Sequence, residues 1–154
     1  MTTNVRIAMA KDLGKILDLD IKSQEYPYTL EELKEFVTDN NHVGFVASIG
    51  RRDIGYALCM LHNQRLGTCV GVHPDFRNLG VSRSLMSKVS NYALQNGCHA
   101  LQFAVPSYKI DDPYDPDYIG WWFESMELKA GSVITDYFFR YGKAWDAYIF
   151  EAMV

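Results

Sequence analysis

The residues best suited to chemistry lie between a predicted strand and a predicted helix, and they read Arg77-Asn78-Leu79-Gly80-Val81-Ser82. Alternating apolar residues predict the strand over Arg65–Val72, and helical spacing begins at Val81. Gly80 permits a tight turn, and the first N–H groups of a helix have no partner within that helix. Together with the helix dipole and the guanidinium of Arg77, these groups favour a negatively charged ligand such as a phosphate.

Two common phosphate-binding motifs are excluded at this turn. It lacks the Gly-Lys-Ser/Thr ending of an NTPase loop, and it lacks the Gly-x-Gly-x-x-Gly of a dinucleotide site. The simplest alternative is an ordinary strand-turn-helix corner that carries a surface arginine.

The wider run resembles a known pattern, and reads Val72-x-Pro74-x-x-Arg77-x-x-Gly80-Val81-Ser82-x-x-Leu85. It is similar to the acyl-CoA pyrophosphate loop of the GNAT superfamily of N-acetyltransferases, Arg/Gln-x-x-Gly-x-Gly/Ala, with Ser82 where the family prefers Gly or Ala. The resemblance implies acetyl-CoA as co-substrate and an amine as acceptor. The implied acetyl-CoA-binding residues are Val70, Gly71, Val72, Arg77, Asn78, Leu79, Gly80, Val81 and Ser82.

The same resemblance implies that the backbone of residues 70–72 holds the pantetheine arm and polarises the thioester. Gly71 fits a close approach of a ligand to a strand, or simply a kink in that strand. Ala104 stands where many family members carry a catalytic carboxylate, and Phe123 stands where many carry a catalytic tyrosine. Either these roles have moved, or the protein is a non-catalytic acyl-CoA-binding or protein-interaction module.

An acidic loop over residues 111–117 is the first place to seek moved roles. Asp112 is a candidate proton acceptor, and Tyr114 or Tyr118 is a candidate proton donor to the leaving thiolate. Asp111 is a candidate contact for a cationic acceptor. The alternatives are a solvated, helix-capping loop and a plain packing role for Tyr118.

The acceptor pocket of this family is walled by the linker between the first two helices. Here that linker carries the candidate substrate-binding residues Glu25, Tyr26 and Tyr28, which could instead form a surface turn. His73 is expected to be structural. The other histidines, His42, His62 and His99, share no ligand spacing, so no metal is expected.

The remaining patterns predict the elements that must position these residues. Helices are expected after Asp12, with Leu13, Ile16, Leu17 and Ile21 inward, and after Thr29, with Glu32 completing a capping box. A third helix is expected to stop at Gly97, and Asp115-Pro116 is expected to open a last one. The predicted strands cover 4–9, 43–49, 54–61, 65–72, 100–105, 133–140 and 145–150. This order indicates a single domain over 1–154, with an α/β, GNAT-like fold and a central mixed, mostly antiparallel sheet flanked by helices.

The composition of the chain indicates which classes of partner are expected. A net charge of −4 disfavours nucleic acid and favours a cationic acceptor, such as a polyamine-like molecule, an antibiotic amine, a protein N-terminus or a lysine. No apolar run reaches the length of a membrane span and no leader opens the chain, so no membrane partner is expected. The three cysteines fit reduced thiols in the cytoplasm. Tyr137, Phe139 and Tyr141 suggest a homodimer surface.

Overall fold

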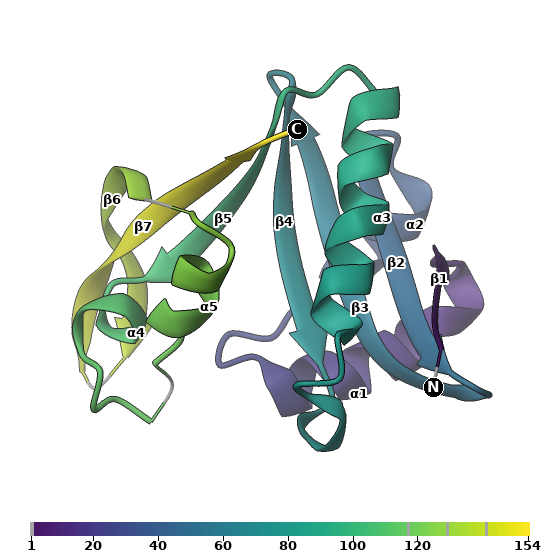
Figure 1. The fold of residues 1–154 in the computed structure, drawn as a ribbon, viewed down its shortest axis with the longest axis horizontal. Coiled ribbons are helices and arrows are strands. Elements are labelled where there is room, and N and C mark those ends of the chain that lie inside the picture. The colour runs from purple at the N-terminus through teal and green to yellow at the C-terminus, as the bar shows by residue number, and fades with distance from the viewer. Residues whose placement is uncertain (1, 117, 129, 141) are drawn as a thin grey trace. The chain divides into compact units, whose positions relative to one another are not determined.

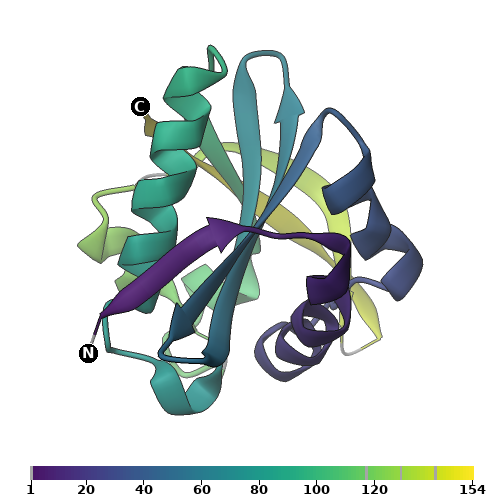
Figure 2. The same cartoon turned by 90° about the vertical axis from the view of Figure 1, so that its right-hand side faces the viewer.

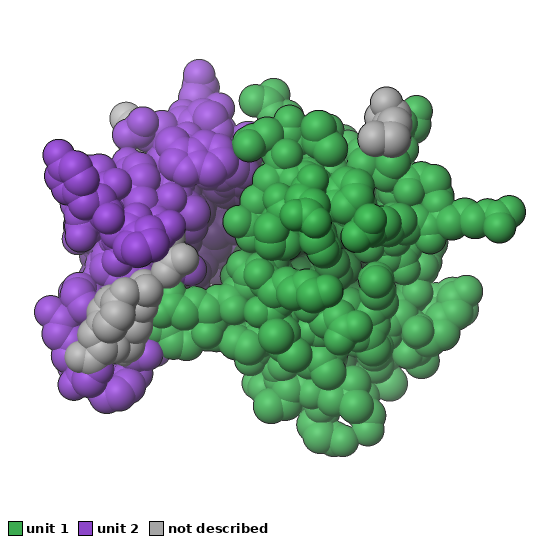
Figure 3. All heavy atoms as spheres, turned by 90° about the horizontal axis from the view of Figure 1, so that it is seen from below, with its two compact units in different colours: residues 1–99 green, residues 100–154 purple. Residues whose placement is uncertain are grey.

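The computed structural model describes residues 2–116, 118–128, 130–140 and 142–154. The chain divides into two compact units, Met1–His99 and Ala100–Val154, which are coloured separately in Figure 3. The single domain expected over 1–154 stays a prediction.

The first unit contains an antiparallel sheet of four strands. Its strands are β1 (Thr3–Ile7), β2 (His42–Ile49), β3 (Arg52–His62) and β4 (Arg65–Val72), paired in that order. Asn63 and Gln64 join β3 to β4 with φ of 49° and 60°, as a type I′ hairpin turn requires. The predicted bounds of β4 are confirmed.

Helices cover both faces of this sheet, as Figures 1 and 2 show. On one face lie α1 (Leu13–Ser23) and α2 (Leu30–Thr38), where Ile16 and Leu33 are buried in one cluster with Tyr56 of β3. On the other face lies α3 (Val81–Gln95), which packs so closely that a β carbon at Gly55 would lie 3.1 Å from Val81. The predicted stop after α3 is confirmed, because Gly97 adopts φ of 75°.

Two expectations for the first helices were only partly met. Ile21 is 59% exposed and Leu19 is buried in its place, so the predicted apolar face of α1 is wrong at its end. Asp12 does not cap α1 with its side chain. Its carboxylate instead accepts hydrogen bonds from the Met9 N–H (2.7 Å) and the Arg6 guanidinium (2.7 and 2.8 Å).

The expected capping box at α2 is confirmed. The Thr29 hydroxyl accepts from the Glu32 N–H (3.2 Å), and the Glu32 carboxylate accepts from the Thr29 N–H (3.0 Å). Both of these otherwise orphan donors are thereby satisfied.

The second unit contains β5 (Ala100–Pro106), β6 (Ala130–Arg140) and β7 (Lys143–Met153), with β7 paired antiparallel to both others. Its helices are α4 (Tyr108–Asp111) and α5 (Gly120–Ser125). Asp115-Pro116 does not open the last helix, which begins at Gly120 instead. The backbone turns through Asp112 and Asp115 instead, since the Asp115 N–H donates to Asp112 O and the Tyr118 N–H donates to Asp115 O. Helix α4 was not predicted from the sequence, and its Tyr108 is buried with its ring 4.9 Å from that of Trp145.

Candidate functional site

The turn between β4 and α3 has the backbone shape that the sequence predicts for anion binding. After β4, a short 3₁₀ turn (Pro74–Phe76) leads to Asn78 and Gly80, which adopt positive φ of 63° and 80°. Gly80 is the N-cap of α3, and a β carbon there would meet nothing within 4 Å. The chain therefore enters the helix beside open space.

The peptide N–H groups of this turn are available to a ligand. Within the described part of the chain, no protein acceptor binds the N–H groups of residues 78–83. The first engaged donor is the Ser84 N–H, which reaches Gly80 O at 3.1 Å. Free amides at the start of a 15-residue helix form a cluster of positive potential.

Arg77 adds a full positive charge, and one hydrogen bond to the end of β4 orients its side chain. Its Nε donates to the carbonyl oxygen of Val72 (3.3 Å), and the remaining guanidinium N–H groups belong to an exposed side chain. The neighbouring Phe76 ring lies 4.8 Å from the Arg52 guanidinium carbon and 5.7 Å from the His73 ring. His73 accepts the Asp75 N–H on Nδ1 (3.1 Å), which fits the structural role expected of it.

The end of β4 presents alternate peptide groups to the edge that faces away from β3. The His73 N–H donates to Ile54 O, and Gly71 pairs with Tyr56, so Gly71 and His73 bond toward β3. Val70 and Val72 therefore point their N–H and C=O groups toward the opposite edge. The Gln24 side chain uses one of these groups, donating from Nε2 to Val70 O at 2.9 Å.

Gly71 has a packing explanation. A β carbon at this position would lie 2.4 Å from Cε1 of Tyr56, so the tyrosine ring occupies the space that a side chain would need. Tyr56 itself is completely buried.

The candidate acceptor residues of the first unit follow α1. The Tyr28 N–H donates to Asp20 Oδ2 (2.6 Å), and the Tyr28 ring lies 5.5 Å from that of Phe36. Tyr26 is 37% exposed and Glu25 is half-buried. Gln24 was missed by the sequence reading, because nothing local marks its contact with a strand 46 residues later.

The candidates of the second unit each have their own local contacts. Asp111 accepts a hydrogen bond from the Tyr148 hydroxyl (2.6 Å), and this bond is the main cause that raises the pKa of Tyr148. Asp112 accepts the Tyr114 N–H (3.0 Å) within its own turn, and Tyr114 is 95% exposed. Tyr118 folds back so that its hydroxyl would lie 2.3 Å from a β carbon at Gly120. Asp117 lies outside the described residues.

The two positions that depart from the family pattern differ in environment. Phe123 is buried and its ring is stacked on that of Phe150 at 4.1 Å, so it is part of the apolar core of its unit. Ala104 is exposed on β5. Neither side chain can exchange a proton.

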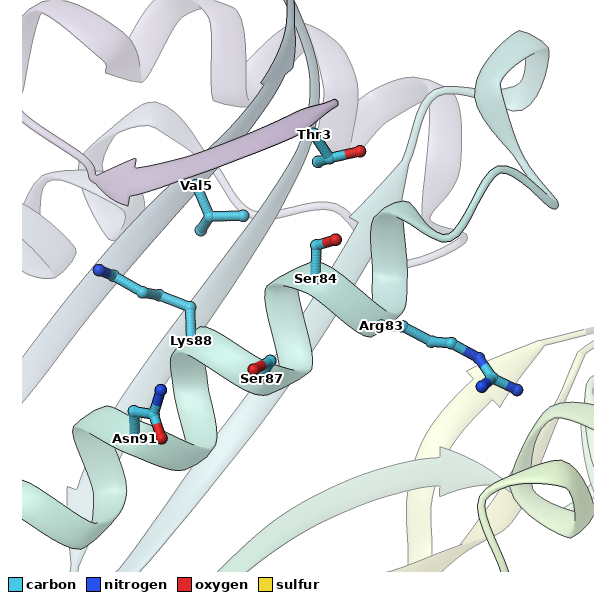
Figure 4. Close-up of a pocket in the computed structure, with 7 residues that line it drawn as sticks. All are labelled: Thr3, Val5, Arg83, Ser84, Ser87, Lys88 and Asn91. Carbon is cyan, nitrogen blue, oxygen red and sulfur yellow. The ribbon is translucent and has the colours of Figure 1, made fainter. Parts of the chain in front are cut away.

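A separate pocket of about 420 Å³ lies between β1 and α3 (Figure 4). Its cations diverge, because Lys88 points toward β1 while Arg83 points to the other side of the helix. Arg83 and Lys88 therefore do not converge on one anion in this pocket. No three His, Cys, Asp or Glu side chains gather as metal ligands in the described ranges.

Comparison with known proteins yields one family. The model of the acetyltransferase (GNAT) family matches residues 11–110. No curated protein matches the sequence significantly.

Solved structures resemble this chain over nearly its whole length. Arabidopsis thaliana NAA60 in complex with acetyl-CoA has a TM-score of 0.80 at 15% identity, covering 99% of each chain. The ribosomal-protein-S18-alanine N-acetyltransferase of Escherichia coli has a TM-score of 0.79 at 14% identity, covering 99% of this chain and 94% of that one. The spermidine/spermine N-acetyltransferase SpeG of Vibrio cholerae has a TM-score of 0.74 at 19% identity, covering 98% and 92%. These likenesses confirm the α/β fold expected from the sequence.

Proposed function

Because the chain belongs to the acetyltransferase (GNAT) family, we propose that it transfers an acetyl group from acetyl-CoA to the primary amine of a cationic acceptor. The family makes it an acetyltransferase with acetyl-CoA as co-substrate. The single observation that supports the site is the set of free N–H groups over residues 78–83, at the turn that carries the family motif.

The turn fits the diphosphate of coenzyme A in charge and in shape. Free N–H groups and the Arg77 guanidinium supply donors, and Gly80 leaves room where a side chain would stand. Ser82, in the first turn of α3, would add the donor of its hydroxyl. Val70, Gly71 and Val72 would bind the pantetheine arm through their backbone, with the Val70 and Val72 N–H groups on the outer edge of β4.

Acetyl-CoA supplies an acetyl group that is already activated as a thioester. The protein must hold an amine in its neutral form next to that group and stabilise the charge that develops on the carbonyl oxygen. Backbone N–H groups of β4 would donate hydrogen bonds to the carbonyl oxygen of the thioester. Asp112 is our candidate to accept the proton from the amine, and Tyr118 or Tyr114 is our candidate to donate a proton to the leaving thiolate.

Acidic and aromatic residues would recognise the acceptor. Asp111 has its carboxylate fixed by Tyr148, and Glu25, Tyr26 and Tyr28 form the segment that follows α1. The net charge of −4 also favours a cationic acceptor. The acceptors named for similar structures are a ribosomal-protein alanine and the polyamines spermidine and spermine. We therefore propose a protein N-terminus or a small polyamine-like molecule.

The test is release of free thiol from acetyl-CoA in the presence of acceptor panels. One panel holds peptides with free α-amines, a second holds the same peptides blocked at the N-terminus but carrying lysine, and a third holds polyamines. Release that depends on one panel identifies the acceptor class. Tight binding of acetyl-CoA with no acceptor-dependent release would contradict the proposal.

That last outcome would favour a non-catalytic acyl-CoA-binding module. The specific observation behind this second function is that Ala104 and Phe123 replace the family carboxylate and tyrosine, with Phe123 committed to the core.

We also propose that the protein forms a homodimer and is located in the cytoplasm. Tyr137 and Phe139 are 55% and 67% exposed on β6, which supports a homodimer that sedimentation can test. Tyr141, expected on the same surface, lies outside the described residues. Cys59, Cys69 and Cys98 form no disulfide with one another, which supports a reducing, cytoplasmic location. Among the described residues, no helix is both long enough and apolar enough to span a bilayer.

A further inference from the structure

Asp20 is a completely buried carboxylate. It joins both ends of residues 24–28, the segment after α1 that carries the acceptor candidates Glu25, Tyr26 and Tyr28 and is called here the acceptor segment. Its backbone carbonyl accepts the Gln24 N–H (2.8 Å), and its Oδ2 accepts the Tyr28 N–H (2.6 Å). Its Oδ1 accepts the hydroxyl of Tyr56. A carboxylate buried this deeply needs such donors, because burial alone raises the pKa of Asp20.

Tyr56 connects this carboxylate to β4. Its ring fills the space above Gly71, and its hydroxyl also lies 3.3 Å from the Ser23 hydroxyl at the end of α1. Because the ring is completely buried, it cannot move away without disturbing the core. The end of α1 and the centre of residues 70–72 are therefore held by one rigid side chain.

Gln24 provides the second connection. Its side-chain amide reaches Val70, and since a carbonyl only accepts, the nitrogen of the amide must face it. Gln24 is also the C-cap of α1, in extended conformation, so its side chain starts from a fixed backbone. Two adjacent residues of β4 are thus held from the same helix end.

We propose that Gln24, set in place by the Asp20–Tyr56 pair, is a positioning residue that fixes residues 70–72 relative to the acceptor segment 24–28. This inference rests on the proposed function, because it requires acetyl-CoA to lie along residues 70–72. Acyl transfer depends on the distance between the amine and the thioester, and a displacement of about 1 Å costs about a hundredfold in rate. The contact acts on geometry and does not touch the reacting atoms.

The test compares Gln24→Met, which keeps the length of the side chain but removes its donor, with the matched control Gln95→Met on the exposed end of α3. We expect kcat with the identified acceptor to fall about tenfold or more in Gln24→Met only. The Kd of acetyl-CoA should stay within about twofold, because the contacts of the turn at 77–82 with the diphosphate, the charged part of the ligand, are unchanged. A kcat equal to that of the control, or a loss of kcat matched by equal losses of acetyl-CoA affinity and of Tm, would overturn the proposal.

A second measurement does not depend on turnover. Amide hydrogen exchange of the free protein should be faster at Gly71, which bonds toward β3, in Gln24→Met and in Tyr56→Phe, which keeps the ring but removes the hydroxyl. The effects of the two variants on kcat should also be non-additive in the double variant, since both weaken the same attachment of residues 70–72 to the end of α1. If the wild type neither binds acetyl-CoA nor transfers acetyl, the proposed function fails, and unchanged exchange at Gly71 would separately overturn the Gln24 contact. Faster exchange combined with unchanged kcat in an active enzyme overturns the positioning role.

Discussion

The ring of Tyr56 occupies the space that a side chain at position 71 would need, with only 2.4 Å between Cε1 and the β carbon that alanine would add. Gly71 is therefore required by the core, on the strand that we propose binds the pantetheine arm. The packing links the stability of the first unit to the geometry of its candidate site.

Gly71→Ala should lower the free energy of unfolding by about 1–3 kcal/mol, as overpacking of a buried site does. The matched control is Gly67→Ala in the same strand, where the β carbon would lie 3.6 Å from the nearest atom, Met60 O. The control should be neutral or slightly stabilising. Urea unfolding measures both. In a Tyr56→Leu background, the cost of Gly71→Ala should shrink, and an undiminished cost would contradict the clash.

Acid stability should depend on Asp12. Its hydrogen bond from the Arg6 guanidinium lowers the pKa of the carboxyl from 3.8 to about 2. A lowered pKa stabilises the fold above the unfolded value, and that stability is lost as pH falls from about 4 through about 2. The pair contributes on the order of 2 kcal/mol at neutral pH. Unfolding measured from pH 7 to pH 2.5 should show this loss in the wild type and in Asp18→Asn but not in Asp12→Asn.

The native thiols should react unequally at pH 8. Burial raises the pKa of Cys59 to about 12 and also raises that of the buried Cys98, whereas Cys69 is partly exposed. Because the thiolate is the reactive form, a thiol reagent should label Cys69 first, and all three only after unfolding. Rapid labelling of Cys59 in the native protein would contradict the burial described here. The result also sets the background of the thiol-release assay.

The pH profile of turnover should report the acceptor. Only the neutral amine attacks the thioester, so kcat/KM should rise with pH up to the pKa of the acceptor amine. An α-amine should give a plateau near about pH 8, whereas a lysine or polyamine amine should give a rise that continues beyond about pH 9. A profile that is flat from pH 6 to 9 would show that a step other than attack by the amine limits the rate.

The parts of the fold that could be predicted from the sequence are those determined by residues close together in the chain. Thr29 and Glu32 carry a complete capping box within four residues, and Gly97 stops α3 by its own conformation. The turn at 77–82 was likewise readable, since a strand, a glycine and a helix start determine it together. Such features depend on neighbours along the chain.

The features that sequence reading missed depend on partners far along the chain. Asp20 looks like a surface residue until the hydroxyl of Tyr56, 36 residues later, satisfies it in the core. Asp111 accepts a hydrogen bond from Tyr148, 37 residues later, and no periodic pattern in the sequence indicates that the two residues are in contact. Helical spacing predicts that Ile21 faces the core, but Leu19 is the residue that is buried there. Tertiary packing overrides helical spacing at such ends.

Arg77 can be tested apart from the backbone. Arg77→Ala should weaken acetyl-CoA binding by about tenfold or more, because a charged donor to a phosphate contributes about 1.5–3 kcal/mol. Arg51→Ala, at an exposed arginine in the turn between β2 and β3, is the control and should bind as the wild type does. Isothermal titration at fixed salt measures both, and equal affinities would remove Arg77 from the site.

The most direct measurement is the titration of acetyl-CoA into Gly80→Asp and Gly50→Asp. Both glycines have positive φ, 80° and 61°, and both would place a β carbon in open space, so the two variants carry the same backbone strain and the same added charge. Only Gly80→Asp puts a carboxylate among the free N–H groups of residues 78–83. We expect Gly80→Asp to lose measurable binding of acetyl-CoA while Gly50→Asp keeps wild-type affinity. Equal binding by the two variants would contradict this expectation.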